Sequence, residues 1–440
     1  MKYTGSLGAA LALPGNLQAK GNSSLTGIKD HFTGLAPDFI YLNSGTEGSM
    51  PDVVIDSLKQ GLERWAASPT DSYETDKIFG KHQQYNRQKV ADFLSVKKDN
   101  ICLTDNTTMG LAMTLTGLNF KAGDRVIVTN HEHPAMMSPL TILQERTGLT
   151  VVKRDFPPPD ILRNITVDEL LDFLFPDRLR GAQALCVSHV YPTTGVRLPL
   201  DALRRKADAL DIRYLVVDGA QAFGMVDTSR GNDHIAHADF YACPGHKWLN
   251  GPPSTGILYI KNAAIRPPEF YPVLSQRMGK YLSPPAAFPM VEALQVRGCS
   301  NAPGFSAMLG AIEFERGLGG ASFVEQHILM LSQQVRDFII ARAPGAMVSP
   351  FRAPELLSGL TVFFPFSWHN PEKIYSDKQT ADRIVKALLK KNIQIRSIGF
   401  ENPADKGQDI YVLRVSTGIF NSSGQIDQFK RALKDALSRI

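Results

Sequence analysis

The stretch Asp239-Phe-Tyr-Ala-Cys-Pro-Gly-His-Lys-Trp-Leu-Asn-Gly251 decides how the rest of the chain is interpreted. Its apolar first half predicts a short buried strand, and its Pro-Gly pair predicts a tight turn that presents His246 and Lys247. A lysine held just past a buried strand is poorly solvated, which lowers its pKa and favours a neutral, nucleophilic amine. Taken alone, the stretch also fits an ordinary surface lysine.

A carboxylate at the end of the preceding predicted strand favours a functional role for this lysine. Tyr214-Leu-Val-Val217 predicts a buried strand, and Asp218 follows it directly. An aldehyde cofactor such as pyridoxal 5′-phosphate (PLP) needs a lysine amine for its Schiff base and an acid that keeps its pyridine nitrogen protonated. Lys247 and Asp218 at the ends of successive strands therefore predict a PLP site.

Composition is ordinary for a globular protein of two or three domains: 440 residues, 43% hydrophobic and 21% charged. The net charge of +5 is spread over the chain without a basic tract, so no nucleic-acid partner is indicated. No apolar run reaches membrane-spanning length. No metal site or disulfide framework is expected, because no Cys-x-x-Cys spacing occurs among the four cysteines, which are Cys102, Cys186, Cys243 and Cys299.

The first residues carry a separate signal. Met1–Gly15 is rich in Gly and Ala and weakly apolar, and Leu17-Gln-Ala19 fits a cleavage site. The stretch resembles the later part of a twin-arginine export signal, although the Arg-Arg box is missing, which suggests that Met1 is not the natural start. We therefore set residues 1–24 apart and expect a periplasmic protein; a disordered or helical extension on a cytoplasmic protein is the alternative.

From residue 100 onward, strands and helices alternate, which is typical of an α/β fold with a mainly parallel sheet. We predict an N-terminal segment at 25–50 that joins a small domain, a large cofactor-binding domain at 51–302, and a smaller α+β domain at 303–440. Ligands of such sheets bind beyond the carboxyl ends of the strands. Five strand ends carry polar groups that we expect to converge, namely Asn106/Thr107/Thr108, His131/His133, Ser188/His189, Asp218/Gln221 and His246/Lys247.

Three of these groups allow more than one interpretation. Asn106-Thr107-Thr108 lies where a helix begins, so it is either a phosphate site or a simple helix cap. His133 would either stack on a cofactor ring or bind a metal together with His131. His234-x-x-His237-x-Asp239 also has metal-like spacing, but its polar surroundings favour a solvated loop.

In chain order, several motifs resemble class V of the fold-type I aminotransferases, the group of isopenicillin N epimerase and cysteine desulfurase. The resemblance covers roughly residues 40–420 and is most specific from Asp218 to Gly256. The motifs are Asn106-Thr-Thr, Glu132-His-Pro, Ser188-His-Val, Asp218-Gly-Ala-Gln221, Gly245-His-Lys-Trp-Leu-x-Gly-Pro, Arg297-Gly-x-x-Asn301 and Arg414-Val-Ser.

The resemblance implies a PLP enzyme with Lys247 bound to the cofactor, Asp218 on its ring nitrogen, and His133 stacked on its ring. It also implies that Arg414 binds a substrate carboxylate, for which a bidentate guanidinium is suited. The family is usually dimeric, and Ser300 would reach the neighbour's phosphate. The remaining implied contacts are Gln221 to the ring hydroxyl, Asn106, Thr107, Thr108 and His246 to the phosphate, and Asn43, Ser44 and Gly45 on the substrate side.

The segment Arg396-Ser-Ile-Gly-Phe-Glu-Asn-Pro403 departs from the family, because cysteine desulfurases carry their sulfur-accepting cysteine there. On that ground we expect an enzyme that is not a cysteine desulfurase. The export-like start leads to a specific hypothesis: periplasmic maturation of the siderophore pyoverdine, in which a glutamate side group becomes succinamide by oxidative decarboxylation. The alternatives are an amino-acid aminotransferase or epimerase, and a PLP-fold protein that binds a partner without catalysis. In the enzyme readings the substrate is a small molecule or peptide bearing an amino-acid group.

Overall fold

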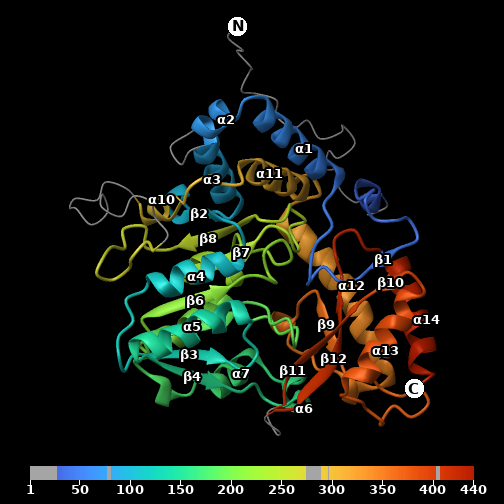
Figure 1. Ribbon diagram of the computed structural model, residues 1–440. Coiled ribbons are helices and arrows are strands. Elements are labelled where there is room, and N and C mark those ends of the chain that lie inside the picture. Colours follow the sequence, from blue (N-terminus) through green and yellow to red (C-terminus); the bar gives the residue numbers. More distant parts are fainter. Residues whose placement is uncertain (1–26, 77–80, 274–288, 296, 403–406) are drawn as a thin grey trace.

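The computed structural model describes residues 27–440 except 77–80, 274–288, 296 and 403–406. The segment 1–24, for which an export signal is predicted, lies outside the described residues. Figure 1 shows a large lobe built on a broad sheet and a smaller lobe that contains the end of the chain, with helix α12 (Ala321–Arg342) running along the boundary between them.

The large lobe contains a seven-stranded sheet in the order β2-β8-β7-β6-β5-β3-β4. All neighbours are parallel except β8, which is antiparallel to both β2 and β7. The α/β class and the mainly parallel sheet predicted from the sequence are thereby confirmed. The strands are β2 (Ile101–Thr104), β3 (Arg125–Thr129), β4 (Thr150–Arg154), β5 (Ala184–Ser188), β6 (Tyr214–Asp218), β7 (Phe240–Pro244) and β8 (Gly256–Ile260).

Both faces of this sheet are covered by apolar side chains, because successive residues of a strand point to opposite faces. In β6, for example, Leu215 and Val217 belong to one hydrophobic core and Val216 to the other. Such double burial explains why the central strands read as continuous apolar runs. The covering helices are α4 (Thr107–Gly117), α5 (Pro134–Thr147), α6 (Pro159–Leu162), α7 (Val167–Leu174), α8 (Leu200–Ala209) and α10 (Met290–Gln295).

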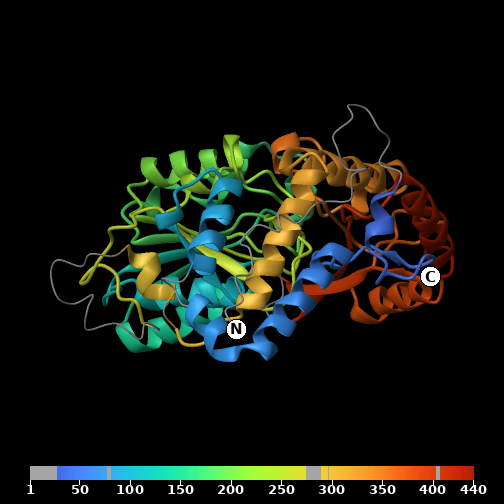
Figure 2. The same ribbon diagram turned by 90° about the horizontal axis from the view of Figure 1, so that it is seen from above.

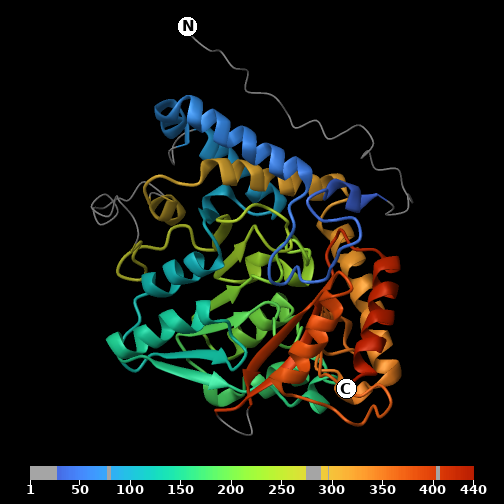
Figure 3. The same cartoon turned by 45° about the vertical axis from the view of Figure 1, so that its right-hand side comes forward.

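A helical layer lies at the β2 end of the sheet. It consists of α1 (Asp52–Ala67), α2 (Pro69–Asp76), α3 (Lys81–Phe93) and α11 (Ala302–Gly317). Helices α1 and α11 lie side by side (Figures 2 and 3), and a Cβ added at Gly61 would sit 2.9 Å from the Pro303 side chain. A glycine at this point lets the two helices approach closely.

The small lobe has an antiparallel sheet in the order β11-β12-β9, formed by β9 (Leu360–Phe363), β11 (Arg396–Glu401) and β12 (Asp409–Ser416). Helices α12, α13 (Lys378–Leu389) and α14 (Ser423–Leu437) pack against it. A separate parallel pair joins β1 (Ile40–Tyr41) to β10 (Ile393–Gln394), so an early segment of the chain becomes part of this lobe.

One predicted strand is divided in two. The sequence favours a single strand over Ile393–Arg396, but Gln394 pairs with β1 whereas Arg396 starts β11 and pairs with β12. Ile395, between them, is buried. The chain changes sheets at this residue because each half finds its partner in a different segment. No helix among the described residues is long and apolar enough to cross a membrane.

Candidate active site

Lys247 lies in the turn that follows β7. The backbone folds back on itself there, with Gly245 N donating to Thr255 O at 2.7 Å and Gly251 N to Gly245 O at 2.8 Å. The segment around Gly48 packs against this turn, and a Cβ at Gly48 would lie only 1.8 Å from Lys247 O. A glycine is therefore required at 48 for the early loop to reach the lysine.

Asp218 faces Lys247 from the end of β6, the neighbouring strand. Asp218 is buried and Lys247 is half-buried, and burial is the main reason why the pKa of Asp218 is raised and that of Lys247 is lowered. Their opposite charges counteract both shifts. Asp218 Oδ1 also accepts a hydrogen bond from Ala220 N at 2.8 Å, which stabilises its ionised form. A poorly solvated amine beside a buried acid is the arrangement expected for the predicted cofactor pair.

Each of the five predicted strand ends contributes to one pocket, although His131 and His189 are not part of its lining. Its lining includes the lysine turn, the end of β6, the starts of α4 and α5, and the segment after β5. The residues are Asn106, Thr107, Thr108, His133, Ala135, Ser188, Val190, Pro192, Asp218, Ala220, Gln221, Pro244, His246 and Lys247.

The α4 end of the pocket fits a phosphate group. Asn106 caps the helix through Oδ1, which accepts from Met109 N at 2.9 Å, so its side chain does what the cap interpretation requires. Thr107 Oγ1 and His246 Nδ1, by contrast, are buried and have no hydrogen-bond partner in the described part of the chain. Unpaired polar atoms beside the free amides of a helix start form a site suited to an anion.

His133 is the N-cap of α5, and its Nδ1 accepts from Ala135 N at 3.1 Å. Burial lowers the pKa of His133 and so favours the neutral ring, whose proton then lies on Nε2. His131 is buried against Phe156 and Phe400, with Nδ1 2.9 Å from Thr193 Oγ1. Within the described ranges, no group of three or more His, Cys, Asp or Glu side chains is arranged to hold a metal.

Glu132 is a site residue that the sequence analysis did not single out as functional. Its carboxylate accepts from Thr129 at 2.8 Å, Tyr191 at 3.0 Å and Ser188 at 2.7 Å. Burial raises the pKa of Glu132 to about 7. No basic side chain of the described residues forms an ion pair with it. The position next to His133 was the available signal, but a single sequence does not show that this glutamate is buried.

Gln221 connects the early loop to the lysine turn. Its Nε2 donates to Gly45 O at 2.8 Å, and its Oε1 accepts from Trp248 Nε1 at 2.9 Å. The contact with a cofactor ring hydroxyl implied by the resemblance stays a prediction. The side chain lines the pocket and holds the Asn43–Thr46 loop in place.

Arg414, in β12, is buried and faces the same site from the small lobe. Its Nη2 donates to Thr46 Oγ1 at 2.8 Å and lies 3.5 Å from Asn43 Oδ1. Among the described residues no carboxylate lies within ion-pair distance, and Arg414 Nε has no partner. Burial, and secondarily Arg396, lowers the pKa of Arg414 to about 9. Ser44 Oγ and Ser416 Oγ are also buried and unpaired nearby.

Other candidates lie elsewhere. Ser300 is outside the pocket lining and accepts from Gln83 Nε2 at 3.2 Å. His234 Nε2 is 3.1 Å from Leu94 O, while His237 Nε2 is 3.1 Å from Gly231 O, so each ring is engaged by the backbone. Cys102, Cys186 and Cys243 are buried, and Cys299 is exposed.

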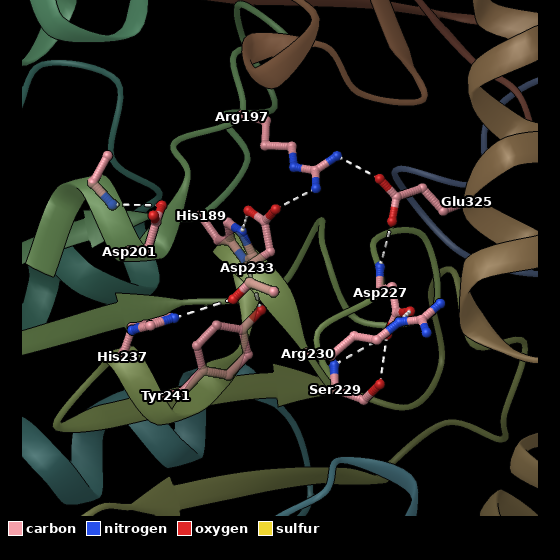
Figure 4. A network of polar contacts seen from close by, with 12 residues as sticks. His189, Arg197, Asp201, Asp227, Ser229, Arg230, Asp233, His237, Tyr241 and Glu325 are labelled. Carbon is pink, nitrogen blue, oxygen red and sulfur yellow. Dashed lines mark hydrogen bonds and ion pairs between the residues drawn. The ribbon is translucent and has the colours of Figure 1, made fainter.

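A second buried polar cluster lies in the large lobe and reaches α12 (Figure 4). His189 bridges Tyr241 Oη at 2.9 Å and Asp233 at 2.8 Å. Arg197 pairs with Asp233 on one side and with Glu325, at 2.6 Å, on the other. Every charged group of this cluster has a partner.

Comparison with known proteins places this geometry among its relatives. The family model "Aminotransferase class-V" matches residues 40–429. A probable cysteine desulfurase of Pyrococcus abyssi is 28% identical over 229 residues, and a cysteine desulfurase of Salmonella dublin is 31% identical over 236. Each alignment covers 51% of this chain and 54% of the relative, so the chain spans about half the length of the curated relatives it matches.

Solved structures share the fold over most of the chain. A mutant of C-DES with glycine covalently linked to its PLP cofactor has a TM-score of 0.73 at 23% identity. The match covers 92% of this chain and 99% of that one. The apo cysteine desulfurase of Thermococcus onnurineus NA1 has a TM-score of 0.71 at 19% identity, with 92% and 96% covered.

These relatives contradict one prediction. The missing cysteine in residues 396–403 led us to exclude a cysteine desulfurase, and that exclusion is wrong, because the curated relatives are cysteine desulfurases. The physical reason is that the absence of one thiol changes a single segment and leaves the rest of the fold as it is. The sheet, the lysine turn and the α4 end of the pocket do not depend on that thiol.

Proposed function

The chain belongs to the class-V aminotransferase family and uses pyridoxal 5′-phosphate, and from this premise we propose that it acts at the α-carbon of an amino-acid group whose carboxylate binds to Arg414. One observation carries the proposal. Arg414 is a buried cation without a carboxylate partner among the described residues, and it faces the half-buried amine of Lys247. A buried charge is stable only when it is paired, so an anion from outside belongs there.

The residues of the pocket fit the cofactor. Thr107, His246 and the amides at the start of α4 would hold its phosphate, and Asp218 would hold its ring nitrogen. When bound, PLP stabilises the negative charge that develops at a substrate α-carbon. Lys247 Nζ would hold the cofactor and then carry a proton to or from that carbon, since burial favours its neutral form. His133 would cover the ring as a neutral imidazole.

Arg414 sets the orientation of the substrate. A guanidinium that fixes the α-carboxylate would restrict how the other bonds of the α-carbon are oriented, and so which of them reacts. The Asn43–Thr46 loop supports this contact, because Thr46 and Asn43 hold Arg414 and Gln221 holds the loop.

The experiment compares amino acids with their decarboxylated amines on the purified holoenzyme. We expect the cofactor absorbance to respond to the amino acids at lower concentration, and Arg414→Gln to remove that difference. Product analysis then identifies the reaction: an oxo acid for transamination, the inverted isomer for epimerisation, carbon dioxide for decarboxylation, or sulfide from cysteine. Equal responses to acids and amines in the unaltered enzyme would contradict the proposal.

A finer proposal concerns the substrate and the compartment. We propose periplasmic maturation of pyoverdine, in which the glutamate side group becomes succinamide by oxidative decarboxylation with an external oxidant such as dioxygen. The export-like sequence of residues 1–24 supports the periplasm as the compartment. A deletion strain should then accumulate pyoverdine with unconverted glutamate. Unchanged siderophore side chains would rule the finer proposal out.

We also propose a homodimer in which Ser300 reaches the phosphate of the neighbouring subunit. Its placement outside the pocket of its own chain supports this arrangement. Light scattering should give the mass of two chains, and Ser300→Ala should weaken the retention of PLP. A monomer with full cofactor would contradict it.

A further inference from the structure

Two arginines stand opposite each other at the substrate side of the site. Arg396 opens β11, and it pairs in register with Arg414 of β12. Side chains of directly opposed residues in an antiparallel pair leave the sheet on the same face. The two guanidinium groups meet at a single atom, Thr46 Oγ1, with Arg396 Nη1 at 3.0 Å and Arg414 Nη2 at 2.8 Å.

The hydroxyl of Thr46 does not neutralise this pair. It donates its own hydrogen to Asn43 Oδ1 at 2.8 Å and accepts from both arginines, so its hydrogen-bonding capacity is used without any negative charge. Like charges placed directly opposite each other in a sheet are destabilising. Neither arginine has a carboxylate of the described residues at ion-pair distance. The nearby Glu47 lies 3.8 Å from His246 instead.

The two arginines differ in depth. Arg414 is buried, whereas Arg396 is exposed at the rim. Both act electrostatically on Lys247, and Arg414 has the larger effect of the two in lowering the pKa of that amine. Arg414 is therefore the inner cation, suited to the carboxylate next to the reacting carbon, and Arg396 is an additional cation farther out.

From this geometry we propose that Arg396 binds a second anionic group of the substrate, so that the preferred substrate is an amino acid whose side chain carries a carboxylate or a phosphate. The inference rests on the proposed function, because it assigns the first carboxylate to Arg414. The charges then balance: the α-carboxylate is placed against the inner guanidinium and the side-chain anion against the outer one. A charge-assisted contact of this kind at a partly solvated rim discriminates by about tenfold or more.

The experiment measures dissociation constants on the holoenzyme by the change in cofactor absorbance. Glutamate is paired with glutamine, aspartate with asparagine, and O-phosphoserine with serine, so that each pair differs in the second charge. We expect each acidic member to bind more tightly than its neutral partner, and the pair with the largest difference identifies the kind of anion. In Arg396→Gln the acid-to-neutral ratio should fall about tenfold, and in Arg396→Lys it should fall less.

Arg383→Gln is the matched control, because Arg383 is an exposed arginine of α13 that lines a different surface. It should leave every ratio unchanged. If acidic and neutral members bind equally well to the unaltered enzyme, or if Arg396→Gln weakens both members of a pair equally, the second subsite does not exist. If no amino acid alters the absorbance of the holoenzyme, the proposed function itself fails.

Discussion

Two arginines with little solvent exposure, the half-buried Arg197 and the buried Arg414, differ in whether the protein supplies their counter-ions. Arg197 lies between Asp233 and Glu325, and Asp233 is held in turn by His189 (Figure 4). Arg414 is at least as deeply buried, yet a threonine and a distant amide are its only described side-chain partners. A cation paired with carboxylates of the protein stabilises the fold, whereas a buried cation without a counter-ion is suited to binding an anionic ligand.

The two regions differ in whether neighbouring charges offset the effect of burial on the pKa values. Burial alone would raise the pKa of Asp233, but hydrogen bonds and charge from His189 and Arg197 bring it down to about 2. Burial would likewise lower the pKa of Arg197, but Asp233 and Glu325 raise it. At Arg414 no carboxylate of the described residues compensates, and burial together with Arg396 lowers the pKa to about 9. The difference is testable by removing one charge at a time.

The largest expected effect is on the stability of the complete cluster. Arg197→Met leaves the buried Asp233 and the half-buried Glu325 without their cation, and the free energy of unfolding should fall by about 3–5 kcal/mol. Urea unfolding followed by circular dichroism measures it. Arg414→Met serves as the control and should cost less than about 1 kcal/mol, because it removes an unpaired charge. Equal losses in both variants would erase the distinction between the two arginines.

Substrate binding should show the reverse order. Arg414→Gln removes the inner cation of the substrate site, and the affinity for an amino acid should fall about 100-fold, or about 3 kcal/mol. Titration of the holoenzyme followed through its cofactor absorbance gives the dissociation constant. Replacement of Arg197, measured in the same way under conditions in which it remains folded, should change this constant less than threefold. The comparison fails if the two variants lose affinity alike.

Glu132 is an intermediate case, since it has three hydroxyl donors but no cation. Its pKa is about 7 in the folded protein, well above the ordinary carboxyl value, so it favours folding at low pH and this contribution is lost as pH rises to 7. The free energy of unfolding of Glu132→Gln, relative to that of the wild type, should therefore rise by on the order of 2 kcal/mol between pH 4.5 and pH 7. Urea unfolding measured between pH 4.5 and pH 7 tests this prediction. If the stabilities of the two proteins change in parallel with pH, Glu132 is not the source of the pH dependence.

The smallest effect is expected at the surface. Lys153 and Glu401 form a 2.6 Å ion pair between β4 and β11, but both side chains are more than two-fifths exposed. Such pairs contribute about 0–1 kcal/mol. Lys153→Met should therefore shift the unfolding midpoint only slightly, and the shift should shrink in high salt. A loss as large as that of Arg197→Met would mean that exposure does not govern these contributions.

Features that depend on local sequence patterns could be predicted from the sequence. Lys247 and Asp218 follow continuous apolar strands, and parallel strands place such ends at one edge, so their meeting could be expected. Arg396 was missed as a binding residue because its importance comes from pairing with Arg414 across a sheet whose register is not visible in the sequence. The break at Ile395 was missed for the same reason, since β1 is more than 350 residues away along the chain.

The exclusion of a cysteine desulfurase failed differently. It relied on the composition of residues 396–403, whereas similarity to the family extends over the whole sheet and the lysine turn. Glu132 shows a further limit. Its neighbours Ser188 and Tyr191 come from another strand end, so its buried environment arises only when the sheet has formed.

The pairing of Ile40 with Ile393 has a consequence for the order in which the molecule is built. The loop that receives both guanidinium groups leaves directly from β1, yet those groups belong to residues that lie 350 and 368 positions further along the chain than Thr46. A growing polypeptide therefore contains Lys247 and Asp218 before the partner surface for Asn43 and Thr46 has been made. The proposed substrate site is complete only when synthesis has passed residue 414, so the two lobes together, rather than the cofactor lobe alone, form it.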